Sequence, residues 1–173
     1  RARHVFAIRD AIVAGADHIA EVISRDNGKT RIDALSTEVL PAAMSAAYYA
    51  KKAKKFLTPK KIGSGNILFF NKKSHIERVP YGVIGIISPW NYPFAIPFHE
   101  IVMALMAGNA VLLKVATQTQ QVAKLIRDVV AAGNIPEGLF HLVNIPGNVA
   151  GQAFIAAGVD KLCFTGSTEA GRD

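Results

Sequence analysis

The sequence has a single cysteine and a single tryptophan among its 173 residues, and it contains no long uninterrupted hydrophobic run. Because Cys163 has no second cysteine to pair with, an internal disulfide is excluded, and we expect a reducing, cytoplasmic environment. Gly, Pro or a charged residue interrupts every apolar stretch well before the roughly 20 residues that span a bilayer, so we predict no membrane partner. The five histidines lack metal-ligand spacing, and we predict no metal site.

Acidic residues are scarce in one segment of the chain. Residues 51–78 hold eight Lys and one Arg against Glu77 alone, so the formal charge of this segment is +8. The whole chain has a formal net charge of +7, so the remaining residues together carry −1. These lysines are not interleaved with stacking aromatic residues, so we interpret them as solvated surface and predict no nucleic-acid binding. The alternative, a basic nucleic-acid-binding protein, predicts binding to DNA with a steep salt dependence.

Half of the residues are hydrophobic, enough for one globular domain with its own core. Apolar residues recur every three or four positions over 5–23, which predicts one amphipathic helix that stops at Asn27-Gly28. A similar pattern over 32–56 predicts a second helix, kinked or broken at Pro41 and ended by Thr58-Pro59. We therefore expect a helical segment over 1–61, followed by a hairpin or extended arm over 62–80 that stands apart from the main sheet.

From residue 81 onward, short apolar runs alternate with helical patterns. We predict strands at 83–87, 110–114, 139–145 and 161–165, and helices at 95–107, from a Thr117 cap to about 132, and at 148–157. Alternation of this kind predicts an α/β fold, a Rossmann-like parallel sheet with flanking helices, over 81–173. The run at 83–87 is continuously apolar, which is typical of a parallel strand covered on both faces.

Ligands of such sheets bind beyond the carboxyl ends of the strands, so the residues that follow each strand are the candidates for chemistry. After the first strand, Pro89 and Pro93 stiffen a loop that presents Asn91, although an asparagine in such a loop is more often a turn residue. Lys114 ends the second strand, where a cation can reach cofactor hydroxyls or phosphates. After the fourth strand, the small-residue turn 165–171 leads toward a helix start that suits a pyrophosphate, but it lacks the Gly-x-Gly-x-x-Gly spacing.

Three segments resemble the aldehyde dehydrogenase superfamily in their order and separation: 82–93 (GVIGIISPWNYP), 107–114 (AGNAVLLK) and 164–171 (FTGSTEAG). The resemblance extends back through Gly28-Lys29 and 48–50. It implies an enzyme that oxidises an aldehyde to a carboxylic acid with NAD or NADP as hydride acceptor. A cysteine thiolate attacks the aldehyde, the Asn91 amide stabilises the oxyanion, and a glutamate-activated water hydrolyses the thioester.

The same resemblance implies roles for individual residues. Asn91 is the catalytic residue, and Tyr92, Ile96 and His99 line the aldehyde pocket. The cofactor-binding residues are Ile87, Ser88, Pro89, Trp90, Lys114, Thr117, Gly147, Gly166 and Ser167. Among them, Lys114 bonds the adenosine ribose, Gly147 lies near the adenine and Ser167 meets the pyrophosphate. The arm resembles part of the family's oligomerisation element, which implies a homodimer or homotetramer.

Four features depart from the family's pattern or lie outside the chain. We expect residues 1–173 to be a truncated cofactor-binding domain cut at both ends, with the catalytic cysteine and glutamate beyond Asp173. Cys163 falls inside a strand and is interpreted as a buried structural thiol. Thr117 replaces a glutamate that grips the ribose 2′-hydroxyl in NAD-preferring relatives, so we expect NADP to be accepted at least as well as NAD. Glu100 replaces a lysine, and its role is open.

Two further alternatives are compatible with the sequence. The chain can be a cofactor-binding module without chemistry of its own, or the parent enzyme can belong to a branch that makes a coenzyme A thioester instead of a free acid.

Overall fold

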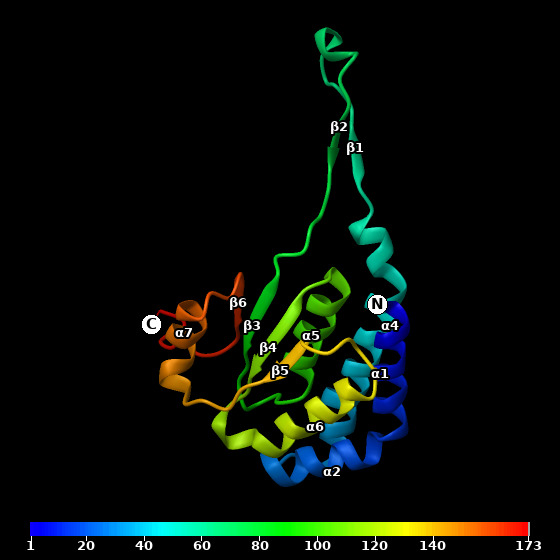
Figure 1. Ribbon diagram of the computed structural model, residues 1–173. Helices are drawn as coiled ribbons and strands as arrows, with labels where there is room; N and C mark the ends of the chain where they lie inside the picture. The colour runs from blue at the N-terminus through cyan, green and yellow to red at the C-terminus, as the bar shows by residue number, and fades with distance from the viewer. Residues whose placement is uncertain (173) are drawn as a thin grey trace.

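The computed structural model describes residues 1–172, in which a group of helices packs on one face of a parallel sheet and a hairpin extends away from both (Figure 1). The helices are α1 (Ala2–Ala14), α2 (Ala16–Asn27), α3 (Arg31–Ala34), the π-helical turn η1 (Leu35–Val39), α4 (Leu40–Leu57), α5 (Ala95–Ala107), α6 (Gln120–Ala131) and α7 (Gly147–Ala156). The strands are β1 (Lys60–Ile62), β2 (Ser74–Ile76), β3 (Val83–Ile87), β4 (Ala110–Lys114), β5 (Phe140–Leu142) and β6 (Lys161–Phe164).

The main sheet has the strand order β5-β4-β3-β6, and all of its strands run parallel. From the central strand β3 the chain steps outward to β4 and β5, then returns through α7 to place β6 on the other side of β3. This confirms the predicted α/β fold class. A reversal of this kind opens a crevice beyond the carboxyl end of the central strand, which is where ligands bind in open parallel sheets.

Strand β3 is covered on both faces, as its continuous apolar run predicts. Ile84 and Ile86 belong to the larger core, which is shared with α5, α6 and the N-terminal helices. Ile87 faces the opposite way and joins a smaller core with Ala150 and Phe154 of α7. The site residues at the end of β3 are thus carried by a strand that packing holds from both sides.

The N-terminal segment forms two helices where we predicted one. The chain breaks at Gly15 because α1 packs mainly on α4 whereas α2 packs on α6, and glycine lowers the cost of the change in direction. The isoleucines of this apolar pattern are nevertheless buried, and α2 stops at Asn27-Gly28 as predicted. Gly28 takes the left-handed conformation, with φ of 82°.

Of the predicted kink or break at Pro41, the break does not occur. The helical path continues from α3 through η1 into α4, and Pro41 occupies the first turn of α4 directly after the π-helical turn. In the π-helical turn before it, the Leu40 N–H donates to the Leu35 carbonyl, so the hydrogen-bond register changes just where Pro41 lacks an N–H to donate. Helix α4 ends at Leu57, directly before the predicted stop at Thr58-Pro59. Ile32, placed on the apolar face by its spacing, is 78% exposed.

A hairpin of β1 and β2 leads away from the body of the molecule, with Lys60 opposite Ile76, and this confirms the predicted extended arm (Figure 1). A short 3₁₀ turn, η2 (Ile67–Phe69), forms the tip of the arm. The tip carries four exposed apolar side chains, Ile67, Leu68, Phe69 and Phe70. None of the helices in the described part of the chain is long and apolar enough to cross a bilayer.

Candidate active site

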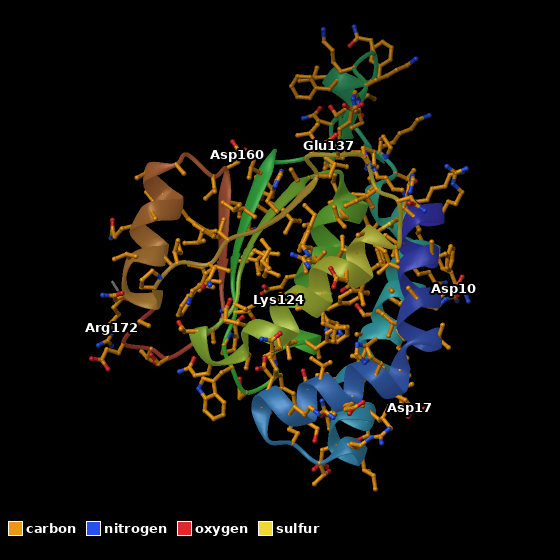
Figure 2. All side chains as sticks on the ribbon, turned by 60° about the horizontal axis from the view of Figure 1, so that its bottom comes forward. Asp10, Asp17, Lys124, Glu137, Asp160 and Arg172 are labelled. Atoms are coloured by element: carbon orange, nitrogen blue, oxygen red, sulfur yellow. The ribbon has the colours of Figure 1, made fainter. Side chains whose placement is uncertain are left out.

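The loop after β3 presents the predicted catalytic amide at the carboxyl edge of the sheet. Figure 2 marks the opposite edge by Asp160 and Glu137, which precede β6 and β5. Ser88 is buried, and its backbone N–H donates to the Lys114 carbonyl at 3.0 Å, which ties the start of the loop to the end of β4. Asn91 is exposed, and no described residue is hydrogen-bonded to its amide. The amide is therefore free to donate to a ligand.

Side chains from the N-terminal helices hold this loop from behind. Asn27 donates through Nδ2 to the Trp90 carbonyl at 2.7 Å. Glu38, completely buried, accepts from the backbone N–H groups of Phe94 and Ala95 at 2.8 and 3.1 Å, where α5 begins. These contacts are absent from our sequence-based interpretation. The signal in the sequence was Glu38, a single carboxylate inside an apolar helical stretch. A carboxylate that is buried in such a stretch needs hydrogen-bond partners.

Lys114 lies at the carboxyl end of β4 with only 5% of its surface exposed, and burial lowers its pKa. Its ammonium group points toward the start of α7, because a Cβ atom added at Gly147 would lie 3.4 Å from Nζ. A side chain at position 147 would fill the space in front of the amine. Lys114 and Gly147, which are distant in sequence, therefore meet at one place.

A cavity of about 340 Å³ lies beside this place, between the start of α7 and the turn after β6. Its lining includes two predicted cofactor-binding residues, Gly147 and Ser167, together with Asn148, Gly151, Gln152, Glu169 and Ala170. Ser167 Oγ accepts from the Ala170 N–H at 3.2 Å, so the turn begins like a capped helix. A Cβ at the neighbouring Gly166 would lie 2.4 Å from Cζ of Phe164, so a larger residue there would have to displace this partly exposed ring.

Thr117 is exposed and opens the 3₁₀ turn η3 (Thr117–Thr119) three residues after Lys114. The prediction that Thr117 caps the following helix is wrong. Helix α6 begins at Gln120, and the Asp26 carboxylate from α2 accepts from the N–H groups of Gln121 and Val122 at 2.9 and 3.0 Å. A residue from another element supplies the cap, which a local sequence pattern cannot reveal.

The three predicted aldehyde-pocket residues lie on the Asn91 loop and the first turns of α5. Tyr92 is 40% exposed, with the Lys29 ammonium 3.8 Å from its ring centroid. Ile96 is half-buried. His99 is half-buried as well, and its Nδ1 is hydrogen-bonded to the Ala95 carbonyl within the same helix.

Glu100 and Cys163 lie close together beside the end of β6. Glu100 Oε1 accepts from Thr165 Oγ1 at 3.4 Å, and its Oε2 is buried without a partner among the described residues. Burial raises the pKa of Glu100, and the bond from Thr165 partly offsets this. Burial also raises the pKa of Cys163, with a smaller contribution from the nearby Glu100. The thiol is half-buried within β6 rather than fully buried.

The described residues contain no cluster of His, Cys, Asp and Glu side chains that could hold a metal ion. A larger groove of about 480 Å³ between α2 and α6 includes Lys124, labelled in Figure 2, but none of the predicted site residues. The candidate site is therefore the edge formed by the Asn91 loop, Lys114 and the cavity at Ser167.

An open parallel sheet with a polar cleft at its point of reversal is the architecture of a nucleotide-binding α/β protein. The family model described as "Aldehyde dehydrogenase family" matches residues 1–173, and the chain belongs to this family. It is 37% identical over 172 residues to a putative succinate-semialdehyde dehydrogenase [NADP(+)] of Mycolicibacterium smegmatis, covering 99% of this chain and 32% of that protein.

It is likewise 36% identical over 172 residues to the 4,4′-diapolycopene aldehyde oxidase of Methylomonas sp, again covering 99% of this chain and 32% of that protein. Among solved structures, the NAD-dependent aldehyde dehydrogenase from Sinorhizobium meliloti superimposes with a TM-score of 0.90 at 30% identity, over 99% of this chain and 34% of that one. The chain thus spans about a third of the length of these relatives.

Proposed function

We propose that this chain supplies the cofactor-binding part and the oxyanion-stabilising amide of an enzyme that oxidises an aldehyde to a carboxylic acid with NAD or NADP. The observation that carries the proposal is the placement of Asn91. Its exposed amide stands on a proline-stiffened loop at the same sheet edge as Lys114 and the cavity at Ser167. Family membership and the names of its NAD- and NADP-dependent relatives support the choice of reaction.

In this proposal each residue acts through ordinary hydrogen bonding. Asn91 donates to the carbonyl oxygen of the aldehyde as that oxygen becomes negative. Lys114 donates to a ribose hydroxyl in front of Gly147, the turn at Gly166 and Ser167 offers N–H groups to the pyrophosphate, and residues 87–90 line the cleft. When bound, the nicotinamide accepts the hydride. Tyr92, Ile96 and His99 border the aldehyde.

We place the cysteine nucleophile and the glutamate base in the part of the family that this chain does not cover, and we propose that residues 1–173 form a cofactor-binding domain. The half-buried Cys163, whose pKa is raised, is poorly suited to attack a carbonyl because the thiolate is the nucleophile. The second candidate function is a cofactor-binding module without chemistry of its own. It is favoured by the roles proposed here for Asn91, Lys114 and Ser167, which bind and orient ligands but form no covalent intermediate.

Cofactor choice follows from Thr117. Its neutral side chain is exposed three residues after Lys114, where a carboxylate would repel a 2′-phosphate. We therefore propose that NADP is accepted at least as well as NAD. A rate with NADP more than tenfold below the rate with NAD, at equal concentrations in the full-length protein, would contradict this.

The setting of the enzyme also belongs to the proposal. The exposed apolar tip of the arm supports a homodimer or homotetramer, and the single cysteine supports a cytoplasmic location.

The test is an assay of the full-length protein with aliphatic, aromatic and semialdehyde substrates, with both cofactors, and with and without coenzyme A. We expect Asn91→Ala to lower kcat by about 10²–10³, because one oxyanion donor is typically worth that much, while the Kd for the nucleotide changes little. Asn91→Asp should be at least as impaired, since a carboxylate repels the developing charge. Full activity in both variants would overturn the proposed role of Asn91, and strict dependence on coenzyme A would assign the acylating branch.

A further inference from the structure

Three side chains of the N-terminal segment, Asn27, Lys29 and Glu38, contact the Asn91 loop, and we call them the loop clamp. Together they touch residues on both sides of Asn91. Asn27 reaches the Trp90 carbonyl, Lys29 reaches the Tyr92 ring, and Glu38 reaches the backbone where α5 begins. The loop is therefore held at points immediately before and after the residue that carries the amide.

Glu38 is the buried centre of this arrangement. It lies in the π-helical turn η1 and has no exposed surface. Its Oε2 accepts from two backbone N–H groups at the start of α5, a helix whose own N-cap residue provides no side-chain hydrogen bond. A carboxylate at this end of a helix is favoured by the helix dipole. Single π-helical turns are rare and are frequently found at functional sites.

Lys29 connects the carboxylate to the exposed side of the loop. Its Nζ lies 2.6 Å from Glu38 Oε1 and 3.8 Å from the centroid of the Tyr92 ring. One ammonium group thus touches the residue next to Asn91 and the carboxylate that fixes the following helix. The Lys29 side chain is only 17% exposed, so this position is not a freely solvated surface pair.

Fold stability alone is a weak explanation for this pair. Burying two charges costs much of what their attraction returns, and apolar substitutes of similar volume are often as stable. What a buried ion pair does provide is one fixed geometry for the groups that it touches. The groups touched here are the flanks of the loop that carries Asn91.

We propose that Glu38 and Lys29 are positioning residues, which hold the Asn91 loop so that the amide meets the aldehyde oxygen. This inference rests on the proposed function of Asn91. A displacement of about 1 Å in an active site can cost on the order of 100-fold in rate, so the effect falls on kcat rather than on nucleotide affinity.

The test compares two variants of the full-length protein, Lys29→Met and Arg31→Met. Lys29→Met removes the ammonium from the clamp, and we expect kcat to fall by about 10- to 100-fold while the Kd for the nucleotide stays within about twofold. Arg31→Met is the matched control, because Arg31 pairs with Asp17 at 3.2 Å on the exposed surface two residues further on. Lys29→Arg should recover most of kcat, since a guanidinium can pair with a carboxylate and stack on a ring.

A second readout reports the loop without requiring any turnover. Trp90, adjacent to Asn91, is the only tryptophan in residues 1–173. In protein labelled with 5-fluorotryptophan, its fluorine resonance is identified by its loss in Trp90→Phe. We expect Lys29→Met and Asn27→Ala to shift or broaden this resonance and Arg31→Met to leave it unchanged.

The two readouts separate the possible failures. If the unmodified protein oxidises no aldehyde, the proposed function fails, yet the resonance still shows whether the clamp holds the loop. If Lys29→Met lowers the melting temperature but leaves both kcat and the Trp90 resonance unchanged, the positioning role is overturned. Glu38→Gln is expected to behave like Lys29→Met, and if it does not fold, the lysine variants decide alone.

Discussion

Glu100 places a carboxyl group between helix α5 and the end of strand β6, where one oxygen accepts from Thr165 and the other is buried without a partner in the described residues. Burial raises the pKa of this group above its ordinary value of 4.5. The folded protein therefore binds this proton more tightly than the unfolded chain does. Its contribution to stability is present at low pH and is lost as the pH rises through the folded-state pKa.

Replacing Glu100 by Gln removes the ionisation and keeps an oxygen for Thr165. We expect the melting temperature of Glu100→Gln to exceed that of the unmodified protein at neutral pH, and the difference to disappear near pH 4. The measurement is thermal unfolding across pH 4 to 8. Glu137→Gln, at an exposed site on the amino edge, serves as the control. Parallel curves for the unmodified protein and Glu100→Gln would contradict the assignment.

For individual residues, the sequence was sufficient to predict which side chains lie at the ends of strands. It was not sufficient to predict the distant side chains that hydrogen-bond to the loops and helix starts around them. Asn91 follows one predicted strand and Lys114 ends another, so the rule for ligand sites of parallel sheets pointed to both. Glu38 lies 56 residues before its partner Phe94, and nothing local to either residue links them. Asp26, which caps α6 in place of Thr117, was missed for the same reason.

Among the elements, β3 and α7 approach closely because Gly85 has no side chain. A Cβ there would lie 2.6 Å from Cδ2 of Phe154 and 3.2 Å from Cδ1 of Leu162. We expect Gly85→Ala to destabilise the fold by about 1–3 kcal/mol through overpacking, measured as a loss of unfolding free energy in urea.

The matched control for Gly85→Ala is Gly151→Ala within α7, where nothing lies within 4 Å of the added Cβ. That variant should be neutral or more stable by about 0.5–1 kcal/mol, because alanine favours the helix. Equal destabilisation by both substitutions would show that close approach at Gly85 is not the cause.

Most elements of the sheet follow from periodicity and stop signals, and the errors occur where tertiary contacts decide. The strands at 83–87 and 110–114 and the helix at 95–107 match their predicted bounds. The helix predicted over 5–23 divides at Gly15 because its two halves meet different neighbours, which its uniform apolar spacing does not distinguish.

For the whole molecule, the arm and its apolar tip form the feature that a monomer leaves exposed, with Ile67 84% and Phe70 81% accessible. We expect Leu68→Glu combined with Phe70→Glu to weaken self-association at least about 100-fold, because each buried apolar side chain contributes about 1.5–3 kcal/mol. The measurement is the molar mass from light scattering across a dilution series of the full-length protein. Asn71→Glu adds a charge beside the tip without removing an apolar group and is the control. Unchanged mass in the double variant would contradict a role of the tip in self-association.

The loop clamp also has a consequence for the order of folding. Its hydrogen bonds join segments 56 to 63 residues apart, with the whole arm lying between them in sequence. Contacts over such separations form only after a large loss of chain entropy, so they come later than the turns and helices that they join. A newly made chain can thus complete its local secondary structure before the amide of Asn91 has acquired its final orientation, and the geometry of the Asn91 loop is among the last features that folding establishes.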